Sequence, residues 1–305
     1  MCLVWGVPYL LIKVAVEEVS ASEVVLARTL LAVVVLLPLA LRAGAVRPAL
    51  RAWRPLLLFA ALEMAGPWFL LAHAEQDLSS SLTGLLVAAV PLVSAVAARV
   101  LREDDRLDRG RLVGLGVGLA GVAVLLGVDV RGDLLAVGAV GLTVLGYAFG
   151  PLVITRSLAH VPATGVNAVA LSMTALLYLP VGGPRLVEDP PSLQPALALL
   201  ALGLVCTALA LVLFFALIAE VGAQRALVIT FVNPAVAVVL GIALLDEPFT
   251  LGTALGFPLV LLGCALATRR DRPQVPQPAG EPAVGVPAAA MHETGQRDAA
   301  APLDR

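Results

Sequence analysis

The chain has 305 residues, of which 60% are hydrophobic and 14% are charged, and its mean hydropathy is +0.96. Soluble domains carry roughly 25% charged residues, so this composition excludes an ordinary water-soluble protein. The net charge is -2, and the basic residues do not form the patch that a nucleic-acid-binding protein needs. The three cysteines have unrelated spacings within apolar stretches, which fits neither a disulfide framework nor a zinc site, and we expect no metal and no cofactor.

Ten apolar stretches follow one another along the chain, and the short connections between them leave no room for a soluble domain. A helix of about 20 residues crosses the roughly 30 Å hydrocarbon core of a bilayer. We therefore predict an all-α integral membrane protein with ten transmembrane helices, at about 2–17, 22–41, 55–73, 79–99, 111–128, 133–155, 163–181, 195–219, 223–245 and 251–268. Residues 269–305 are rich in Pro, Ala and Gln without apolar periodicity, which predicts a disordered cytoplasmic tail.

The second half of the chain repeats the first. Prolines and glycines recur at a spacing of 142 or 143 residues, as Pro8 with Pro151, Pro38 with Pro180, Pro91 with Pro234, Gly114 with Gly256 and Gly121 with Gly263. Five is an odd number of spans, so a second copy enters the membrane from the opposite side. The sequence thus predicts two inverted five-helix repeats, at 1–128 and 133–268, a plan typical of secondary transporters.

The first predicted span is short. Seven residues precede Pro8, whereas about 18 lie between Asp133 and the matching Pro151. This difference indicates a translation start upstream of Met1, although local thinning of the bilayer would also accommodate a short helix. A signal peptide is disfavoured because no basic leader is present and Lys13 interrupts the apolar segment.

The positive-inside rule sets the orientation. With a cytoplasmic amino terminus, sixteen arginines lie on the cytoplasmic side, and only Arg131 and Arg185 lie outside. We expect both termini, Arg51 and Arg106 to face the cytoplasm, and Glu75, Glu188 and Asp246 to face outward. Nineteen of the 20 basic residues are arginine, which suggests a GC-rich bacterial gene and a multi-pass protein of the bacterial cytoplasmic (inner) membrane.

Several motifs recur near the ends of both halves. The second half contains AQRALVITFVNPAVAVVLGIALLDEPFTLGTALGFPLVLLG, and the first contains SSLTGLLVAAVPLVSAVAARVLREDDRLDRGRLVGLGVGLAG. With the early Trp5–Gly6 and Arg28 in the second span, this layout resembles EamA-type members of the drug/metabolite transporter superfamily. The resemblance implies a secondary active transporter, often an exporter, that moves amino acids, metabolites or drugs by alternating access.

Polar residues in the first two spans are candidates for a substrate site. Trp5, Tyr9 and Lys13 are spaced by four, which places two aromatic rings and a cation on one stripe of a helix. The alternative is that Lys13 pairs with Glu17 and reaches the outer surface. Arg28 is expected to be neutralised by Glu23 or Glu17.

Bent helices supply the other candidates. Glu63 lies four residues before Pro67, so its carbonyl group is freed at a kink near mid-membrane. Glu63 is the acidic residue best placed for coupling to protons, and pairing with Lys13 or Arg28 is the alternative. In the second half, Gly150–Pro151 near Tyr147 and Asn233–Pro234 also predict kinked helices with polar side chains beside the break. Broken helices at corresponding positions of two halves indicate a midplane site. The predicted substrate-binding residues are Trp5, Tyr9, Lys13, Trp68, Tyr147 and Asn233, with Glu63 for coupling.

An enzyme is the competing hypothesis, because Asp104, Asp105 and Asp108 match the DDxxD pattern with which membrane prenyltransferases bind magnesium diphosphate. Four neighbouring arginines explain this run equally well as charge balance, and a second acidic cluster on the same side is missing. We therefore expect no enzyme. The expected partners are a small-molecule substrate and the lipid bilayer, with protons as a coupling ion, whereas the sequence leaves the oligomeric state open.

Overall fold

The computed structural model describes residues 1–100, 109–129, 134–221 and 229–267, and every regular element within these ranges is helical. The first half contains α1 (Cys2–Ala15), α2 (Ala21–Arg42), α3 (Val46–Arg51), α4 (Trp53–Ala60), η1 (Ala61–Ala65), α5 (Gly66–Asp77), α6 (Ser80–Val87), α7 (Val90–Val100) and α8 (Arg109–Asp129). The second half contains α9 (Leu134–Val153), η2 (Ile154–Leu158), α10 (Ala163–Glu188), α11 (Leu193–Leu200), η3 (Ala201–Leu209), α12 (Ala210–Val221), α14 (Ile229–Leu245) and α15 (Leu251–Ala267). The predicted all-α class is confirmed. The predicted tail at 269–305 lies outside the described residues.

Within the described part of the chain, six helical stretches are long and apolar enough to cross a membrane: Ala21–Arg42, Trp53–Asp77, Ser80–Ala97, Leu134–Leu158, Ala163–Glu188 and Leu193–Phe214. Four shorter apolar helices accompany them: Cys2–Ala15, Leu112–Leu126, Val232–Leu245 and Leu251–Ala267. Large apolar side chains point away from the bundle, as Leu134 and Leu135 do with 80% of their surface exposed. An apolar exterior of this kind suits lipid rather than water. The count of ten spans remains a prediction.

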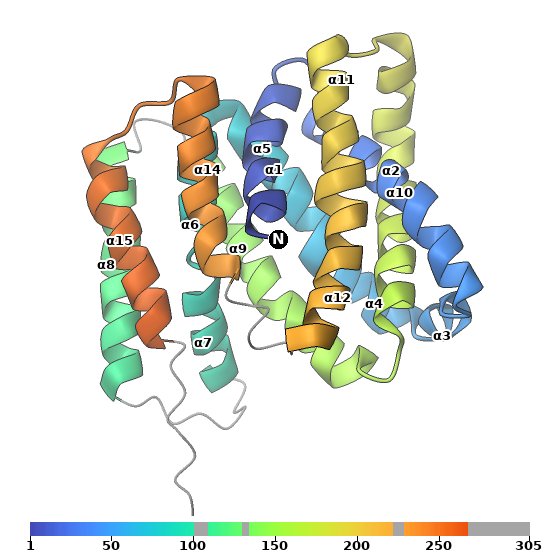
Figure 1. Ribbon diagram of the computed structural model, residues 1–305, viewed down its shortest axis with the longest axis horizontal. Coiled ribbons are helices and arrows are strands. Elements are labelled where there is room, and N and C mark those ends of the chain that lie inside the picture. Colours follow the sequence, from blue (N-terminus) through green and yellow to red (C-terminus); the bar gives the residue numbers. More distant parts are fainter. Residues whose placement is uncertain (101–108, 130–133, 222–228, 268–305) are drawn as a thin grey trace, which may run out of the picture. The chain divides into compact units, whose positions relative to one another are not determined.

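Successive helices run alternately up and down, so their connections gather at two ends of the unit formed by Met1–Arg269 (Figure 1). We name the end that carries the turns at 16–20, 78–79, 189–192 and 246–250 the Ser79 end. The opposite end, with the turns at 43–45 and 159–162, is the Gly44 end. The predicted orientation places the Ser79 end outside the cell.

Three helical stretches widen into π-helical turns, named η1, η2 and η3. Pro67 has no backbone N–H to donate, which disturbs the regular hydrogen bonding where η1 meets α5. At the repeat spacing of 142 residues, the η1 positions correspond to 203–207, which lie within η3. Positions that the predicted repeat would equate are therefore both π-helical, and such turns are frequent at functional sites.

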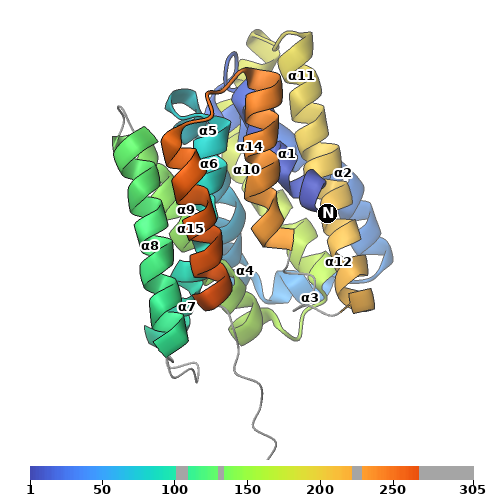
Figure 2. The ribbon, with the colours of Figure 1, turned by 60° about the vertical axis from the view of Figure 1, so that its left-hand side comes forward.

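Matching helices of the two halves pack on each other. Helix α8 lies along α15, and α2 lies along α10 (Figures 1 and 2). The α8–α15 contact depends on glycine, because a Cβ added at Gly121 would lie 2.9 Å from the carbonyl oxygen of Gly256, and one added at Gly263 would overlap Gly118. Small residues of this kind let two membrane helices approach closely.

Candidate functional site

Lys13 on α1 binds the carboxyl end of α5. Its Nζ donates to the carbonyl oxygen of Glu75 at 2.6 Å and to that of Leu78 at 2.9 Å. A cation at this position complements the negative end of a helix dipole. The alternative in which Lys13 pairs with Glu17 is not seen, because Glu17 is exposed in the turn after α1, whereas Lys13 binds α5, 62 residues away in the chain.

Arg28 on α2 is 7% exposed and joins the two halves of the chain. Its Nε donates to Thr207 Oγ1 in η3 at 2.8 Å, and its guanidinium carbon lies 3.8 Å from the centre of the Trp68 ring. A desolvated cation over an aromatic face is attracted by the ring quadrupole. The predicted neutralisation by Glu23 is wrong, because Glu23 accepts the backbone N–H of Ser20 in a capping box at the start of α2.

Glu63 lies in η1 and faces α9. Its Oε2 is buried without a hydrogen-bond partner among the described residues. A Cβ added at Gly150 would overlap this oxygen, so the absence of a side chain at Gly150 makes room for the carboxylate. The predicted kink at Glu63 thus meets the predicted kink at Gly150–Pro151. Lys13 and Arg28, the alternative partners of Glu63, bind other groups.

Glu75 is a buried carboxylate that the sequence interpretation missed. Its side chain is 0% exposed, and both carboxylate oxygens have no hydrogen-bond partner within the described ranges. The missed signal was helical spacing, because Glu75 lies four residues after Leu71 and three before Leu78, which are both buried. Lys13 and Glu247 interact with it electrostatically.

Glu247, from the end motif of the second half, caps a helix of the first half. Its Oε1 accepts the backbone N–H of Ser80 at 2.7 Å, and its Oε2 accepts that of Ser81 at 3.0 Å. These groups begin α6, where unsatisfied N–H donors and the helix dipole favour a carboxylate. Glu247 therefore connects the two halves at the Ser79 end.

The predicted aromatic residues fall into two groups. Tyr9, Tyr147 and Trp68 belong to the interior network, since Tyr147 interacts with Arg28, Glu63 and Trp68, and Tyr9 interacts with Tyr147 and Glu75. Trp5 stacks on Phe214 of α12, with ring centroids 4.7 Å apart. Asn233 lies on α14, and its carbonyl oxygen would be 3.0 Å from a Cβ at Gly6, so Asn233 and Trp5 share the α1–α14 contact.

Five of the seven predicted site residues thus lie in one interior network, together with Arg28 and Glu75, whereas Trp5 and Asn233 lie toward the amino-terminal end of α1. Tyr9 connects the two groups, because it packs at Gly84 beside Ala237, four residues after Asn233. The acidic run Asp104, Asp105 and Asp108 lies outside the described residues.

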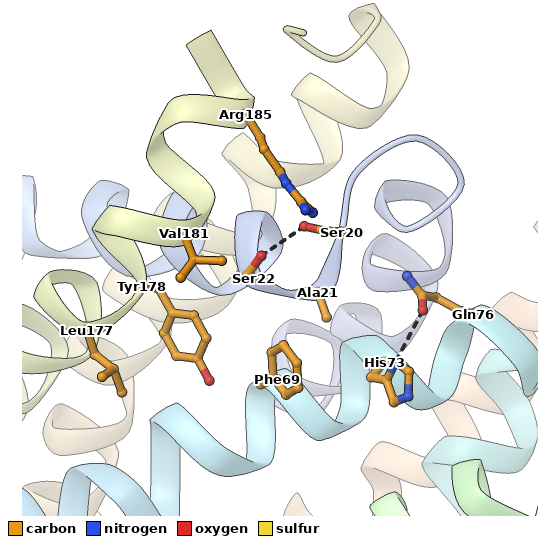
Figure 3. Close-up of a pocket in the computed structure, with 10 residues that line it drawn as sticks. All are labelled: Ser20, Ala21, Ser22, Phe69, His73, Gln76, Leu177, Tyr178, Val181 and Arg185. Carbon is orange, nitrogen blue, oxygen red and sulfur yellow. Dashed lines mark hydrogen bonds between the residues drawn. The ribbon is translucent and has the colours of Figure 1, made fainter. Parts of the chain in front are cut away.

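A groove of about 530 Å³ opens at the Ser79 end between α2, α5 and α10 (Figure 3). Phe69 stacks between His73 and Tyr178, at centroid distances of 6.2 and 5.8 Å. The Tyr178 hydroxyl donates to the carbonyl oxygen of Ala65 at 3.0 Å, and Arg185 lies at the rim beside Ser20. The sequence predicted none of these residues as part of a binding site.

Comparisons with a protein family, with curated proteins and with a solved structure each cover most of the chain. A sequence profile of the EamA-like transporter family matches residues 1–127 and 131–269. Proteins named uncharacterized inner membrane transporter YedA, from Escherichia coli K12 and Escherichia coli O157:H7, are 27% identical over 270 residues, and the match covers 87% of each chain. A solved structure titled "Crystal structure of protein" has a TM-score of 0.58 at 19% identity, covers 88% of this chain and 94% of its own, and shares the fold.

Proposed function

Because the chain belongs to the EamA-like transporter family, we propose that it is a secondary active transporter that exports small organic metabolites, amino acids or drugs by alternating access. The family match and the similar proteins named transporters support a membrane transporter rather than an enzyme. The similar YedA proteins are named inner membrane transporters, which supports a place in the bacterial cytoplasmic membrane.

The interior network of ionisable side chains carries this proposal. Lys13, Arg28, Glu63 and Glu75 all turn inward in an apolar bundle. A charged residue at the centre of a membrane helix costs roughly 2.5 to 3.5 kcal/mol on insertion scales, so such residues mark pathways for substrates or ions. A purely structural bundle would be more stable with apolar residues at these positions.

The packing pattern supports two inverted five-helix repeats. In the predicted repeat, α10 is the counterpart of α2, and α4 with η1 is the counterpart of η3. The α2–η3 contact therefore predicts contacts of α10 with α4 and η1, and both are present. Likewise, α9 is the counterpart of α1, and α6 with α7 is the counterpart of α14. The α1–α14 contact therefore predicts contacts of α9 with α6 and α7, which are present. Alternating access in this family of folds is proposed to rock one bundle against the other around a fixed site.

The network favours an organic solute with an apolar or aromatic body and a polar group. Aromatic faces from Tyr9, Trp68 and Tyr147 lie beside the cations Lys13 and Arg28. We assign substrate binding to the predicted set of Trp5, Tyr9, Lys13, Trp68, Tyr147 and Asn233 and add Arg28. Glu63, with a buried oxygen that lacks a described partner, is the proposed proton-coupling group.

The experiment is a flux screen on purified protein in liposomes. Metabolites, amino acids and drugs are presented with and without an imposed proton gradient, and the expected result is gradient-driven movement of at least one solute class. Liposomes that contain the Arg28→Ala variant provide the matched control. A flat result for every solute with correctly folded protein would refute transport.

The orientation needs a separate measurement. Cysteines introduced at positions 51 and 188, at opposite ends of the bundle, are labelled in intact cells with a membrane-impermeant reagent. We expect labelling at 188 alone. Labelling at 51 alone from outside would reverse the proposed orientation without affecting the transport assignment.

A further inference from the structure

The α5–α6 turn contains a concentration of buried oxygen atoms that lack partners. Among the described residues, the buried side-chain atoms without hydrogen bonds are Oε2 of Glu63, both carboxylate oxygens of Glu75, and the hydroxyl oxygens of Ser80, Ser81 and Thr83. All of them except that of Glu63 fall within nine consecutive residues. Glu75, Ser80 and Thr83 are 0% exposed, and Ser81 is 6% exposed. Buried polar atoms are normally paired, so this group requires a ligand or water.

The charges around this turn leave one negative charge uncompensated. The ammonium of Lys13 is directed at the carbonyl oxygens of Glu75 and Leu78, and the carboxylate of Glu247 is directed at the N–H groups of Ser80 and Ser81. Each of these two charges therefore compensates a helix end. Lys13 attracts the Glu75 carboxylate, but this one ammonium lies near two carboxylates, Glu75 and Glu247, so one negative charge remains. A fully buried carboxylate without a hydrogen-bond partner is too costly to persist as an anion.

The other titratable and charged groups near α5 do not compensate Glu75. On the elements packed against α5, these groups are Cys2, Tyr9, Lys13, Glu23, Arg28, Arg42, Glu63 and Tyr147, and Glu247 lies in the turn after α14. Arg42 lies at the opposite, Gly44 end of α2. Arg28 is held by Thr207 and Trp68, and Glu23 is held by Ser20. The remaining charged neighbours are carboxylates, which would repel an ionised Glu75.

We propose that the α5–α6 turn binds one monovalent cation through the Glu75 carboxylate, with a sodium ion or a proton as the occupant. One unit of positive charge balances the site. The buried hydroxyl groups of Ser80, Ser81 and Thr83, within eight residues of Glu75 along the chain, are candidate oxygen ligands of the hard type that a sodium ion prefers, whereas a proton needs the carboxylate alone. Within the described residues no three Asp, Glu, His or Cys side chains converge, which disfavours a divalent or transition metal.

This site deepens the proposed function, on which its role as a coupling site rests, because it joins both halves of the transporter. Glu75 belongs to the first half, and Glu247, which caps the same turn, belongs to the second. A cation held there would favour the arrangement in which the two halves meet at the Ser79 end. The binding itself can be tested without any measurement of transport.

The test is the thermal unfolding of the purified full chain in detergent. Tm is measured in NaCl against choline chloride at equal ionic strength and across a series of pH values. If sodium binds, Tm rises with the NaCl concentration relative to choline chloride. A bound proton instead raises Tm as the pH falls, because the folded protein then binds more protons than the unfolded chain.

Variants assign the response to Glu75. Glu75→Gln is expected to abolish it, whereas Asp77→Asn, which removes an exposed carboxylate two residues away, keeps the wild-type response. Thr83→Val is expected to weaken apparent sodium affinity about 10-fold, and an unchanged acid response in this variant identifies the proton.

A second variant tests the proposal if Glu75→Gln does not fold. Lys13→Met, which removes the nearby positive charge, should tighten binding of either ion. A wild-type response that Glu75→Gln reproduces, or that Lys13→Met leaves unchanged, would overturn the proposal.

Discussion

The carboxylate of Glu247 accepts the backbone N–H of Ser80 at 2.7 Å, so a residue of the second half caps a helix of the first half. Ser81 donates to the other carboxylate oxygen, and no side chain of α6 replaces this contact at those two groups. The connection between the halves at the Ser79 end therefore includes directed hydrogen bonds that a change of conformation can break and form again.

Replacing Glu247 by alanine should destabilise the protein by about 1 to 2 kcal/mol, since two N–H groups at the start of α6 lose their acceptor. Glu247→Gln should cost less, because the amide oxygen still accepts one bond. Thermal unfolding in detergent measures both variants. Glu188→Ala, at an exposed carboxylate of the same end, is the control, and equal losses at 188 and 247 would argue against the cap.

Arg28 and Thr207 should be energetically coupled. The Arg28→Lys variant loses the Nε–H that Thr207 accepts and the flat contact with Trp68, so lysine does not substitute for it. Thr207→Val removes the other partner. A double-mutant cycle on unfolding free energy should give a coupling of about 0.5 to 1.5 kcal/mol. Strict additivity of the two changes would show that this contact contributes nothing.

Gly150 should tolerate a methyl group only when Glu63 is shortened. A Cβ at position 150 overlaps Glu63 Oε2, so Gly150→Ala is expected to lower Tm in the wild-type chain. In a Glu63→Ala background the same change should be nearly neutral or stabilising, because the overlap is gone and alanine favours helix by about 1 kcal/mol. Comparable losses in both backgrounds would mean that Glu63 does not occupy this position.

The Glu18–Ser192 contact should make stability depend on pH. Hydrogen bonds from the side chain and backbone of Ser192, at 2.6 and 2.8 Å, lower the pKa of Glu18. A carboxyl with a lowered folded-state pKa stabilises the protein above its unfolded pKa, and this contribution disappears as the pH falls through the folded pKa. Ser192→Ala should therefore lower Tm at neutral pH and have little effect at acidic pH. A difference that stays constant with pH would exclude ionisation of Glu18.

The sequence predicted the helices well because their ranges depend on local apolarity and on the thickness of a membrane. It also placed Glu63 and Gly150 near two proline kinks, and the structure brings these kinks together. It failed for Lys13 and Arg28, for which partners were sought within a few residues. Their actual partners lie 62 and 179 residues away. Glu23 was unavailable to Arg28 because the local capping box already used it.

The burial of Glu75 was also not predictable from its local sequence. Its neighbours His73, Gln76 and Asp77 are exposed, so the segment has the composition of a surface turn. Burial of this one carboxylate results from α1 and the turn after α14 closing over it. Only the packing of elements distant in sequence produces such a site, and composition within one helix does not reveal it.

The most direct test of the account is gradient-driven flux through Glu63→Gln compared with the wild-type protein, reconstituted at equal density with a solute that the screen identifies. The amide retains the shape of the carboxylate but cannot bind and release a proton. We predict that the imposed proton gradient drives flux in the wild type and in the exposed-carboxylate control Glu188→Gln, but not in Glu63→Gln. Normal flux with an unchanged pH dependence in Glu63→Gln would contradict the coupling role of the interior network.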